Sequence, residues 1–113
     1  MIWQYDPHSG GNKIDKKQHD IIRKKIISYA KSKYHDLFEE LEVKFRGKFC
    51  YINTKKDSKH FMPIGRMRFF DMDRWSIAIF LYGNETYEPG WFPNNEDFGN
   101  IEECVDYCSQ FFF

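Results

Sequence analysis

The chain has 113 residues, of which 42% are hydrophobic and 19% aromatic, and its seventeen basic residues balance seventeen acidic ones. A chain this aromatic buries enough apolar surface to fold, so the composition excludes an intrinsically disordered protein, and seven glycines with four prolines exclude a collagen-like one. The length is typical of one domain, and we expect a single α+β domain over residues 1–113 with an irregular N-terminal segment at 1–12.

The first predicted element is a long amphipathic helix over about residues 13–38, with a break near residues 34–36. Apolar side chains recur at helical spacing on one face, and basic side chains occupy the opposite face. The apolar face consists of Ile22, Ile26, Tyr29, Ala30, Leu37 and Leu41, and the basic face of Lys17, Lys24, Lys31 and His35.

From Leu41 onward the apolar period changes to two, which predicts β-strands. The expected strands are 41–52, which Gly47 interrupts, 64–70 and 75–82, and a short strand around 87–88 would be a fourth; a loop at 53–63 and turns at 71–74 and 83–86 separate them. Gly47 marks a bulge, a bend or a tight hairpin. A register slip there would exchange Phe49 and Tyr51 with Cys50 and Ile52 between the two faces of the sheet.

The last predicted element is a helix that begins after a loop at 89–100. Asn100 stands at the N-cap position, and Glu103 three residues later completes a capping box. One face of this helix is apolar and carries Ile101, Cys104, Val105, Cys108 and Phe112. We therefore predict an α+β fold with a long N-terminal helix, an antiparallel meander of three to four strands and a C-terminal helix, with both helices on one sheet face.

The segments FRGKFCYI, RMRFF and DRWSIAIFLYGNETYEP, followed by a helix that opens with FGNIEEC, resemble a family of small bacterial proteins of unknown function over roughly residues 38–113. The resemblance implies no activity, cofactor or catalytic residue. The α-β-β-β-α order is also similar to that of double-stranded-RNA-binding domains, where basic residues at the start of the last helix grip phosphates. Here Glu102 and Glu103 occupy that position and would repel phosphate.

Charge is distributed unevenly along the chain. Residues 1–74 hold all seventeen basic and ten acidic residues, a net charge of +7, whereas residues 75–113 hold seven acidic and no basic ones, a net charge of −7. Such asymmetry is typical of a nucleic-acid-binding surface or of an acidic partner surface. It also arises when two parts of a fold simply attract each other.

Alternation along the strands predicts that Lys44, Arg46, Arg66 and Arg68 point away from the core, beside either Phe80 and Tyr82 or the residues that alternate with these two on the adjacent strand. A sheet face of arginine and aromatic residues is consistent with a solvated surface, with a protein interface or with stacking of nucleic-acid bases. The loop at 83–99 adds four aromatic residues, Tyr87, Trp91, Phe92 and Phe98, which either bind a partner or fold back onto the core. The predicted partner-binding residues are Arg46, Arg66, Arg68, Tyr82, Trp91 and Phe92.

The leading hypothesis is a small non-enzymatic module that binds a protein partner, by analogy with accessory or anti-defence inhibitor proteins of bacteria and mobile elements. The alternative is a nucleic-acid-binding protein that uses the basic first helix and the sheet arginines, with Lys17, Lys24, Lys31 and Lys44 as contacts. We expect no catalytic residues, no cofactor and no metal, because no catalytic or zinc spacing occurs, although Cys50 with His60 is a conceivable nucleophile and base. Three cysteines and no hydrophobic leader favour a cytoplasmic protein without membrane contact.

Overall fold

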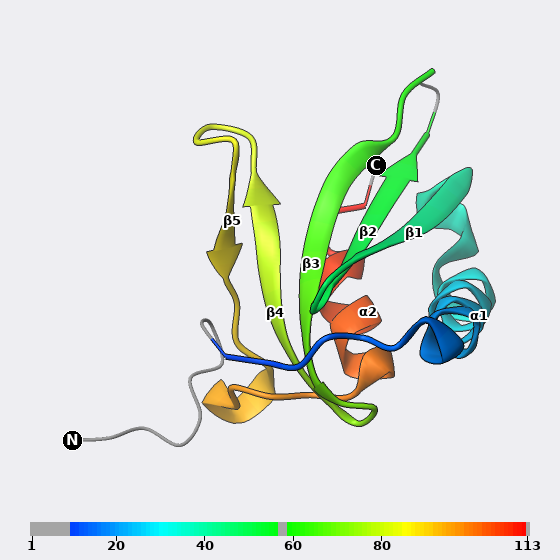
Figure 1. Ribbon diagram of the computed structural model, residues 1–113. Coiled ribbons are helices and arrows are strands. Elements are labelled where there is room, and N and C mark those ends of the chain that lie inside the picture. The colour runs from blue at the N-terminus through cyan, green and yellow to red at the C-terminus, as the bar shows by residue number, and fades with distance from the viewer. Residues whose placement is uncertain (1–9, 57–58, 113) are drawn as a thin grey trace.

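The computed structural model describes residues 10–56 and 59–112 and confirms the α+β fold. Its sheet has five strands, one more than the largest number expected. They are β1 (Glu40–Arg46), β2 (Phe49–Lys55), β3 (Met62–Asp71), β4 (Arg74–Leu81) and β5 (Thr86–Pro89). Neighbouring strands are antiparallel and follow one another in the order β1-β2-β3-β4-β5, so the sheet is the predicted meander (Figure 1).

The long first helix, α1 (Lys16–Tyr34), ends where the break was expected. It begins at Lys16 because the side chain of Asp15 caps it, accepting a hydrogen bond from the backbone N–H of Lys17 at 3.0 Å. A short 3₁₀-helix, η1 (His35–Leu37), follows. This change of helix type removes Leu37 from the apolar face, so the prediction of Leu37 as a core residue is wrong, and its side chain is 41% exposed.

The strands β2 and β3 extend into the region predicted as a loop at 53–63. Asn53 belongs to β2 because its side-chain amide donates to the Glu42 carboxylate of β1 at 2.9 Å, and Thr54 is completely buried opposite Leu41. Polar residues therefore continue this strand by pairing across the sheet, which local hydropathy does not indicate. The turn between β1 and β2 is a two-residue hairpin, in which Gly47 adopts φ 60°, the conformation that its lack of a Cβ allows.

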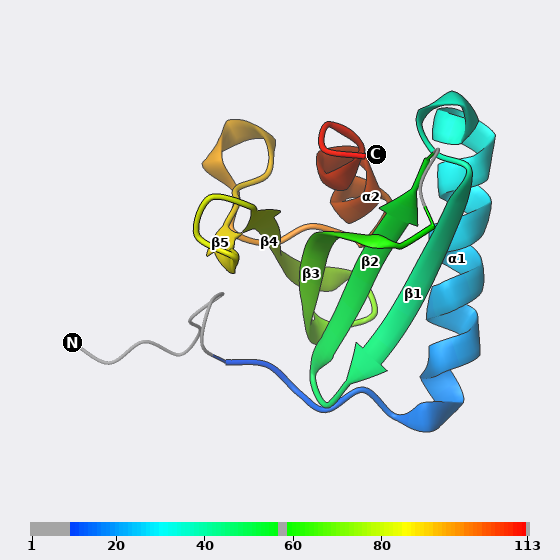
Figure 2. The same cartoon turned by 90° about the horizontal axis from the view of Figure 1, so that it is seen from above.

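Both helices cover the same face of the sheet (Figure 2). The second helix, α2 (Ile101–Ser109), has the predicted capping box: the Asn100 side chain accepts from the Glu103 backbone N–H at 2.8 Å, and the Asn100 N–H donates to the Glu103 carboxylate at 2.9 Å. The core between the layers takes apolar side chains from both helices and the strands, among them Ile22, Ile26, Ala30, Val43, Cys50, Ile52, Met67, Trp75, Ile77, Cys104, Val105 and Cys108.

Polar contacts join the two helices at the edge of the core. Asp106 of α2 accepts hydrogen bonds from the hydroxyls of Tyr29, at 2.8 Å, and Tyr34, and from the ammonium group of Lys33 at 3.2 Å. The hydrogen bonds of Lys33 with Tyr29 and Asp106 raise the pKa of its ammonium group above the usual value. Within the described residues, no helix combines the length and apolarity that a bilayer crossing demands.

Candidate functional site

The sheet face that points away from the helices, here called the outer face, carries the predicted arginines. The strand register arranges its side chains in two rows across the sheet. One row consists of Lys44, Tyr51, Arg66, Ala78 and Pro89, and the other of Arg46, Phe49, Arg68 and Ser76. Each β3 arginine therefore lies between an aromatic residue of β2 and a small residue of β4. We call Phe49, Tyr51, Arg66, Arg68 and Tyr87 the arginine–aromatic cluster.

Arg66 lies between two aromatic rings of this cluster. Its guanidinium carbon is 4.4 Å from the centroid of the Phe49 ring and 5.1 Å from that of the Tyr87 ring, both within the range of cation–π attraction. Within residues 10–56 and 59–112 the Arg66 guanidinium forms neither a hydrogen bond nor an ion pair. A guanidinium offers five N–H donors in a planar fork that matches a carboxylate or a phosphate. Arg66 is thus held in place by rings while its donors remain available for an anion.

A hollow of about 160 Å³ lies beside Arg66. It exists because Ser76 and Ala78 of β4 have small side chains, and Tyr87 and Pro89 of β5 complete its wall. Burial raises the pKa of Tyr87 to about 12, so its hydroxyl stays protonated at neutral pH. In the described part of the chain this hydroxyl has no hydrogen-bond partner. The hollow is therefore bordered by two hydrogen-bond donors that suit an anion.

The ring faces of the cluster are already occupied by cations and by other rings. The guanidinium of Arg68 lies 4.8 Å from the Phe49 centroid, so two arginines share that ring. Tyr87 makes edge contacts with Tyr51 and Phe80, at centroid distances of 5.7 and 5.1 Å. Stacking of a nucleic-acid base needs an open ring face. These rings position the arginines rather than offering a platform for bases.

The other predicted partner-binding residues of the sheet lie around this cluster. Arg46 is exposed at the end of β1, and Tyr82 is exposed directly after β4, where its ring packs edge-on against Phe80 at 4.9 Å. Arg68 is buried, and its guanidinium donates to the carbonyl of Gly10 at 2.9 Å. Arg68 therefore also fixes the segment that leads into α1.

The two predicted partner-binding residues of the loop after β5 lie in different environments. Trp91 is 53% exposed, whereas Phe92 is 3% exposed and lies in the core. The Phe92 ring fills the space that Gly99 leaves open, because a Cβ at Gly99 would be 2.7 Å from that ring. Phe92 thus pins its loop to the core and lies outside any surface that a partner can touch.

The residues of the nucleic-acid alternative fall on two separate surfaces. Lys17, Lys24 and Lys31 are exposed on α1, turned away from the buried face of that helix, while Lys44 lies on the outer face of the sheet. Since α1 covers the opposite face of the sheet, the four lysines do not form one continuous patch with the sheet arginines (Figure 2).

Sequence reasoning did not assign Phe49 and Tyr51 to the site, and it placed Tyr87 in the candidate loop rather than on the sheet face. The signal for the first two is the alternation of Phe49-Cys50-Tyr51-Ile52, which places either the rings or Cys50 and Ile52 in the core. The tight hairpin at Gly47 decides the register: Cys50 pairs with Phe45 and Met67 and is buried, so the rings point outward. Tyr87 joins them only through the pairing of β5 with β4.

The environment of the three cysteines does not favour a reactive thiol. All of them are free and buried in one core, and burial raises the pKa of each thiol, with the neighbouring Cys108 adding to the effect at Cys50 and Cys104. His60, the base considered for Cys50, is exposed in the connection between β2 and β3. In segments 10–56 and 59–112, no three potential metal ligands among His, Cys, Asp and Glu cluster closely enough to hold an ion.

We expect all three thiols to react slowly with iodoacetamide in the native protein at neutral pH. The thiolate is the reactive form, and both burial and the raised pKa values suppress it. Mass spectrometry over time measures the modification, and the same protein in urea is the control, where all three should react at the rate of free cysteine. Fast native modification of Cys50 would contradict this prediction and revive the idea of a cysteine nucleophile.

No protein-family model matches this chain, and no match was found among curated proteins or among solved structures.

Proposed function

We propose that this protein is a small non-enzymatic interaction module that binds an acidic protein partner through its outer face. The observation that carries the proposal is Arg66, which two rings hold in place and which has no anionic or hydrogen-bonding partner within the described residues. A binding module of this kind acts by occupying a partner's surface, as accessory and inhibitor proteins do.

The charge of the outer face supports an acidic partner. Lys55 pairs with Glu40 at 2.6 Å, and Lys44 approaches Glu42 at 3.8 Å, so these lysines have their own carboxylates. Arg46 and Arg66 have none in the described segments, which leaves the centre and one end of the face positive. Complementary charge steers association and selects partners, and arginine and aromatic residues are enriched in protein interfaces.

The arrangement favours a protein over a nucleic acid for two reasons. The faces of Phe49 and Tyr87 are covered by guanidinium groups, which leaves little open ring for bases. The helix lysines, which would add phosphate contacts, belong to the other side of the molecule. A carboxylate on a folded partner would be bound at one place, the hollow beside Arg66, and needs neither open rings nor the helix lysines.

The test is a capture experiment with three baits: the native protein, Arg66→Gln and Lys24→Gln. Lysate is treated with nuclease, and the retained proteins are identified by mass spectrometry. We expect at least one protein to be retained by the native and Lys24→Gln baits and lost with Arg66→Gln. With that partner purified, Arg66→Gln should weaken binding by about 2 kcal/mol or more, as for an interface hot spot.

Lys24→Gln is the matched control, because it removes one exposed positive charge from α1 instead of from the outer face. If all three baits retain the same proteins, the proposal fails. If the proteins retained from an untreated lysate are lost after nuclease treatment, and if the purified protein binds mixed oligonucleotides with an affinity that falls steeply with salt, the nucleic-acid alternative replaces it.

A further inference from the structure

The hollow beside Arg66 is bordered by two positive charges. Arg68 lines it together with Arg66, and their guanidinium carbons lie 4.8 and 4.4 Å from the centroid of the Phe49 ring. Arg68 is fixed in this position, because its guanidinium donates to the Gly10 carbonyl at 2.9 Å. Like charges that share one ring repel each other, so both arginines attract an anion that enters the hollow.

None of the described residues that line this hollow is acidic. Glu88 is the one acidic residue of β5, and its neighbours Tyr87 and Pro89 both line the hollow. Glu88 itself pairs with Ile79, a core residue, so strand alternation directs the Glu88 side chain to the helix side of the sheet. There its carboxylate accepts a hydrogen bond from the Thr86 hydroxyl at 3.1 Å. The nearest carboxylate along β5 therefore does not neutralise the two arginines.

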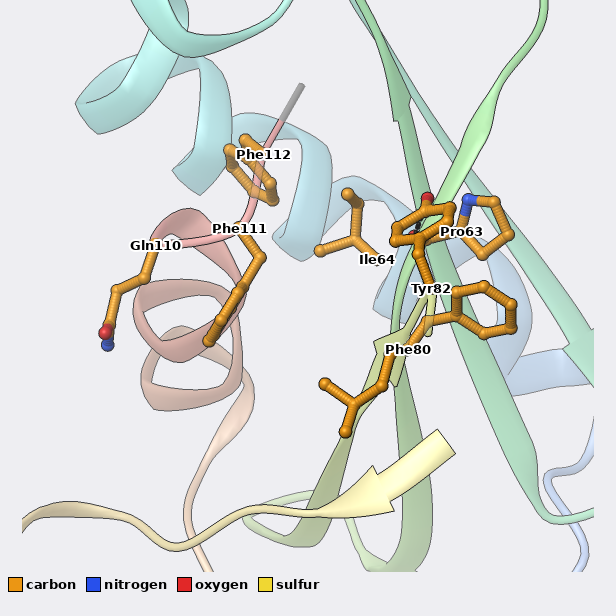
Figure 3. A pocket seen from close by; sticks show the side chains of 8 residues that line it. Pro63, Ile64, Phe80, Tyr82, Gln110, Phe111 and Phe112 are labelled. Atoms are coloured by element: carbon orange, nitrogen blue, oxygen red, sulfur yellow. Dashed lines mark hydrogen bonds between the residues drawn. The ribbon is translucent and has the colours of Figure 1, made fainter. Parts of the chain in front are cut away.

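A second hollow, of about 370 Å³, has a different character. It opens on the helix side of the sheet, where Ile64 of β3 faces Phe111 and Phe112 beyond the end of α2 (Figure 3). None of the described residues that line it carries a charge. This apolar groove attracts no anion, so positive charge is what distinguishes the hollow beside Arg66.

The volume of the hollow beside Arg66 matches one compact group. Its volume of about 160 Å³ corresponds to roughly five water molecules at about 30 Å³ each. A phosphate group with its ester oxygen has one phosphorus and four oxygen atoms and is therefore similar in size. A carboxylate group has only three heavy atoms and would leave part of the hollow to water.

The donors at the hollow also match a phosphate monoester. Such a group has three terminal oxygens and carries close to two negative charges at neutral pH. The planar fork of Arg66 can bind two of these oxygens, and the Tyr87 hydroxyl can donate to the third. A carboxylate has two oxygens, which the fork satisfies by itself, so the Tyr87 hydroxyl would gain no partner. The phosphodiesters of a nucleic acid carry only one charge for each phosphate.

We infer that the hollow beside Arg66 receives the phosphate group of a phosphorylated side chain of the protein partner. The inference rests on the proposed function, in which the outer face binds an acidic protein. Arg66 pairs with the phosphate, and Arg68 compensates its second negative charge. The rings of Phe49 and Tyr87 hold Arg66 in place before binding, which lowers the entropic cost of forming the pair. Arginine clusters are a recurring means of recognising phosphorylated segments.

The test is a titration of the full-length, isotopically labelled protein at neutral pH with N-acetyl-O-phosphoserine methylamide and with the corresponding glutamate compound. Binding is followed by the backbone amide signals of Ile77 and Ala78, which line the hollow. We expect the phosphoserine compound to bind about tenfold more tightly than the glutamate compound. Arg66→Gln should abolish the saturable shifts. Tyr87→Phe keeps the ring and should weaken phosphoserine binding about fivefold, with less than about a twofold effect on the glutamate compound.

Lys24→Gln is the control, because it removes one exposed positive charge from α1, and it should change both affinities less than about twofold. Equal affinity for the two compounds, or an equal effect of Tyr87→Phe on both, would show that the hollow does not select phosphate. The capture experiment is repeated with phosphatase-treated lysate, and the Arg66-dependent proteins should no longer be retained. If they persist, the phosphate inference is wrong while the proposed function stands. If the Arg66→Gln bait retains the same proteins as the native bait, both fail.

Discussion

Trp75→Ala should lower the free energy of unfolding by about 3–5 kcal/mol, the range for removal of a large buried aromatic side chain. Trp75 is 0% exposed, and its ring packs 5.0 Å from the ring of Phe69. The indole N–H donates to the Met72 carbonyl at 2.8 Å. The substitution removes this hydrogen bond and leaves a cavity in the core beside the ring of Phe69. Urea unfolding followed by far-UV circular dichroism measures the loss.

Trp91→Ala is the matched control, since the same side chain is 53% exposed there, and it should change the free energy of unfolding by less than about 0.5 kcal/mol. If Trp75→Ala does not fold, Trp75→Phe serves instead, because it keeps much of the apolar volume and should show a smaller loss. Equal effects of the Trp75 and Trp91 substitutions would contradict the assignment of Trp75 to the core.

Gly65→Ala should lower the free energy of unfolding by about 1–3 kcal/mol through overpacking. A Cβ at this position would lie 2.5 Å from the Sγ of Cys108 and 3.4 Å from the Ala78 carbonyl oxygen. Both atoms belong to packed elements, so β3 and α2 would have to separate. The measurement is again urea unfolding, in a double-mutant cycle with Cys108→Ala.

In that cycle the double variant should be more stable than the sum of the single changes by about 1 kcal/mol or more, because Cys108→Ala removes the clashing sulfur and the new methyl group fills part of its space. Gly83→Ala is the control: no atom lies within 4 Å of its added Cβ, and we expect no loss of stability. Strictly additive single effects would show that the close approach of β3 and α2 does not limit position 65.

These two stability predictions concern the core, and they leave the outer face unchanged. This separation matters for the functional test, because Arg66 is not among the buried core residues. A loss of binding in Arg66→Gln, with an unfolding curve like that of the native protein, therefore reports on the interface rather than on folding.

Local signals predicted those parts of the fold that local interactions determine. The capping box of Asn100 and Glu103 lies within one turn, and it began α2 at the expected residue. The alternation in β1 and β3 correctly directed Arg46, Arg66 and Arg68 outward. The prediction that Leu37 lies in the core was wrong because the helical period was extended past the end of α1. The fifth strand was harder to predict, because Thr86–Pro89 is stabilised by pairing with β4 rather than by its own hydrophobic pattern.

The sequence by itself determined the fold class, the two helices, the turns at 71–74 and 83–86 and the presence of arginines on one sheet face, because each depends on residues within a few positions of one another. Only the tertiary structure decided what those arginines touch. Arg66 of β3 lies between Phe49 of β2 and Tyr87 of β5, and the small side chains of β4 leave the hollow beside it. That geometry arises from the pairing of four strands and from the register set at Gly47, and hydrophobic periodicity along one strand carries no information about its neighbours.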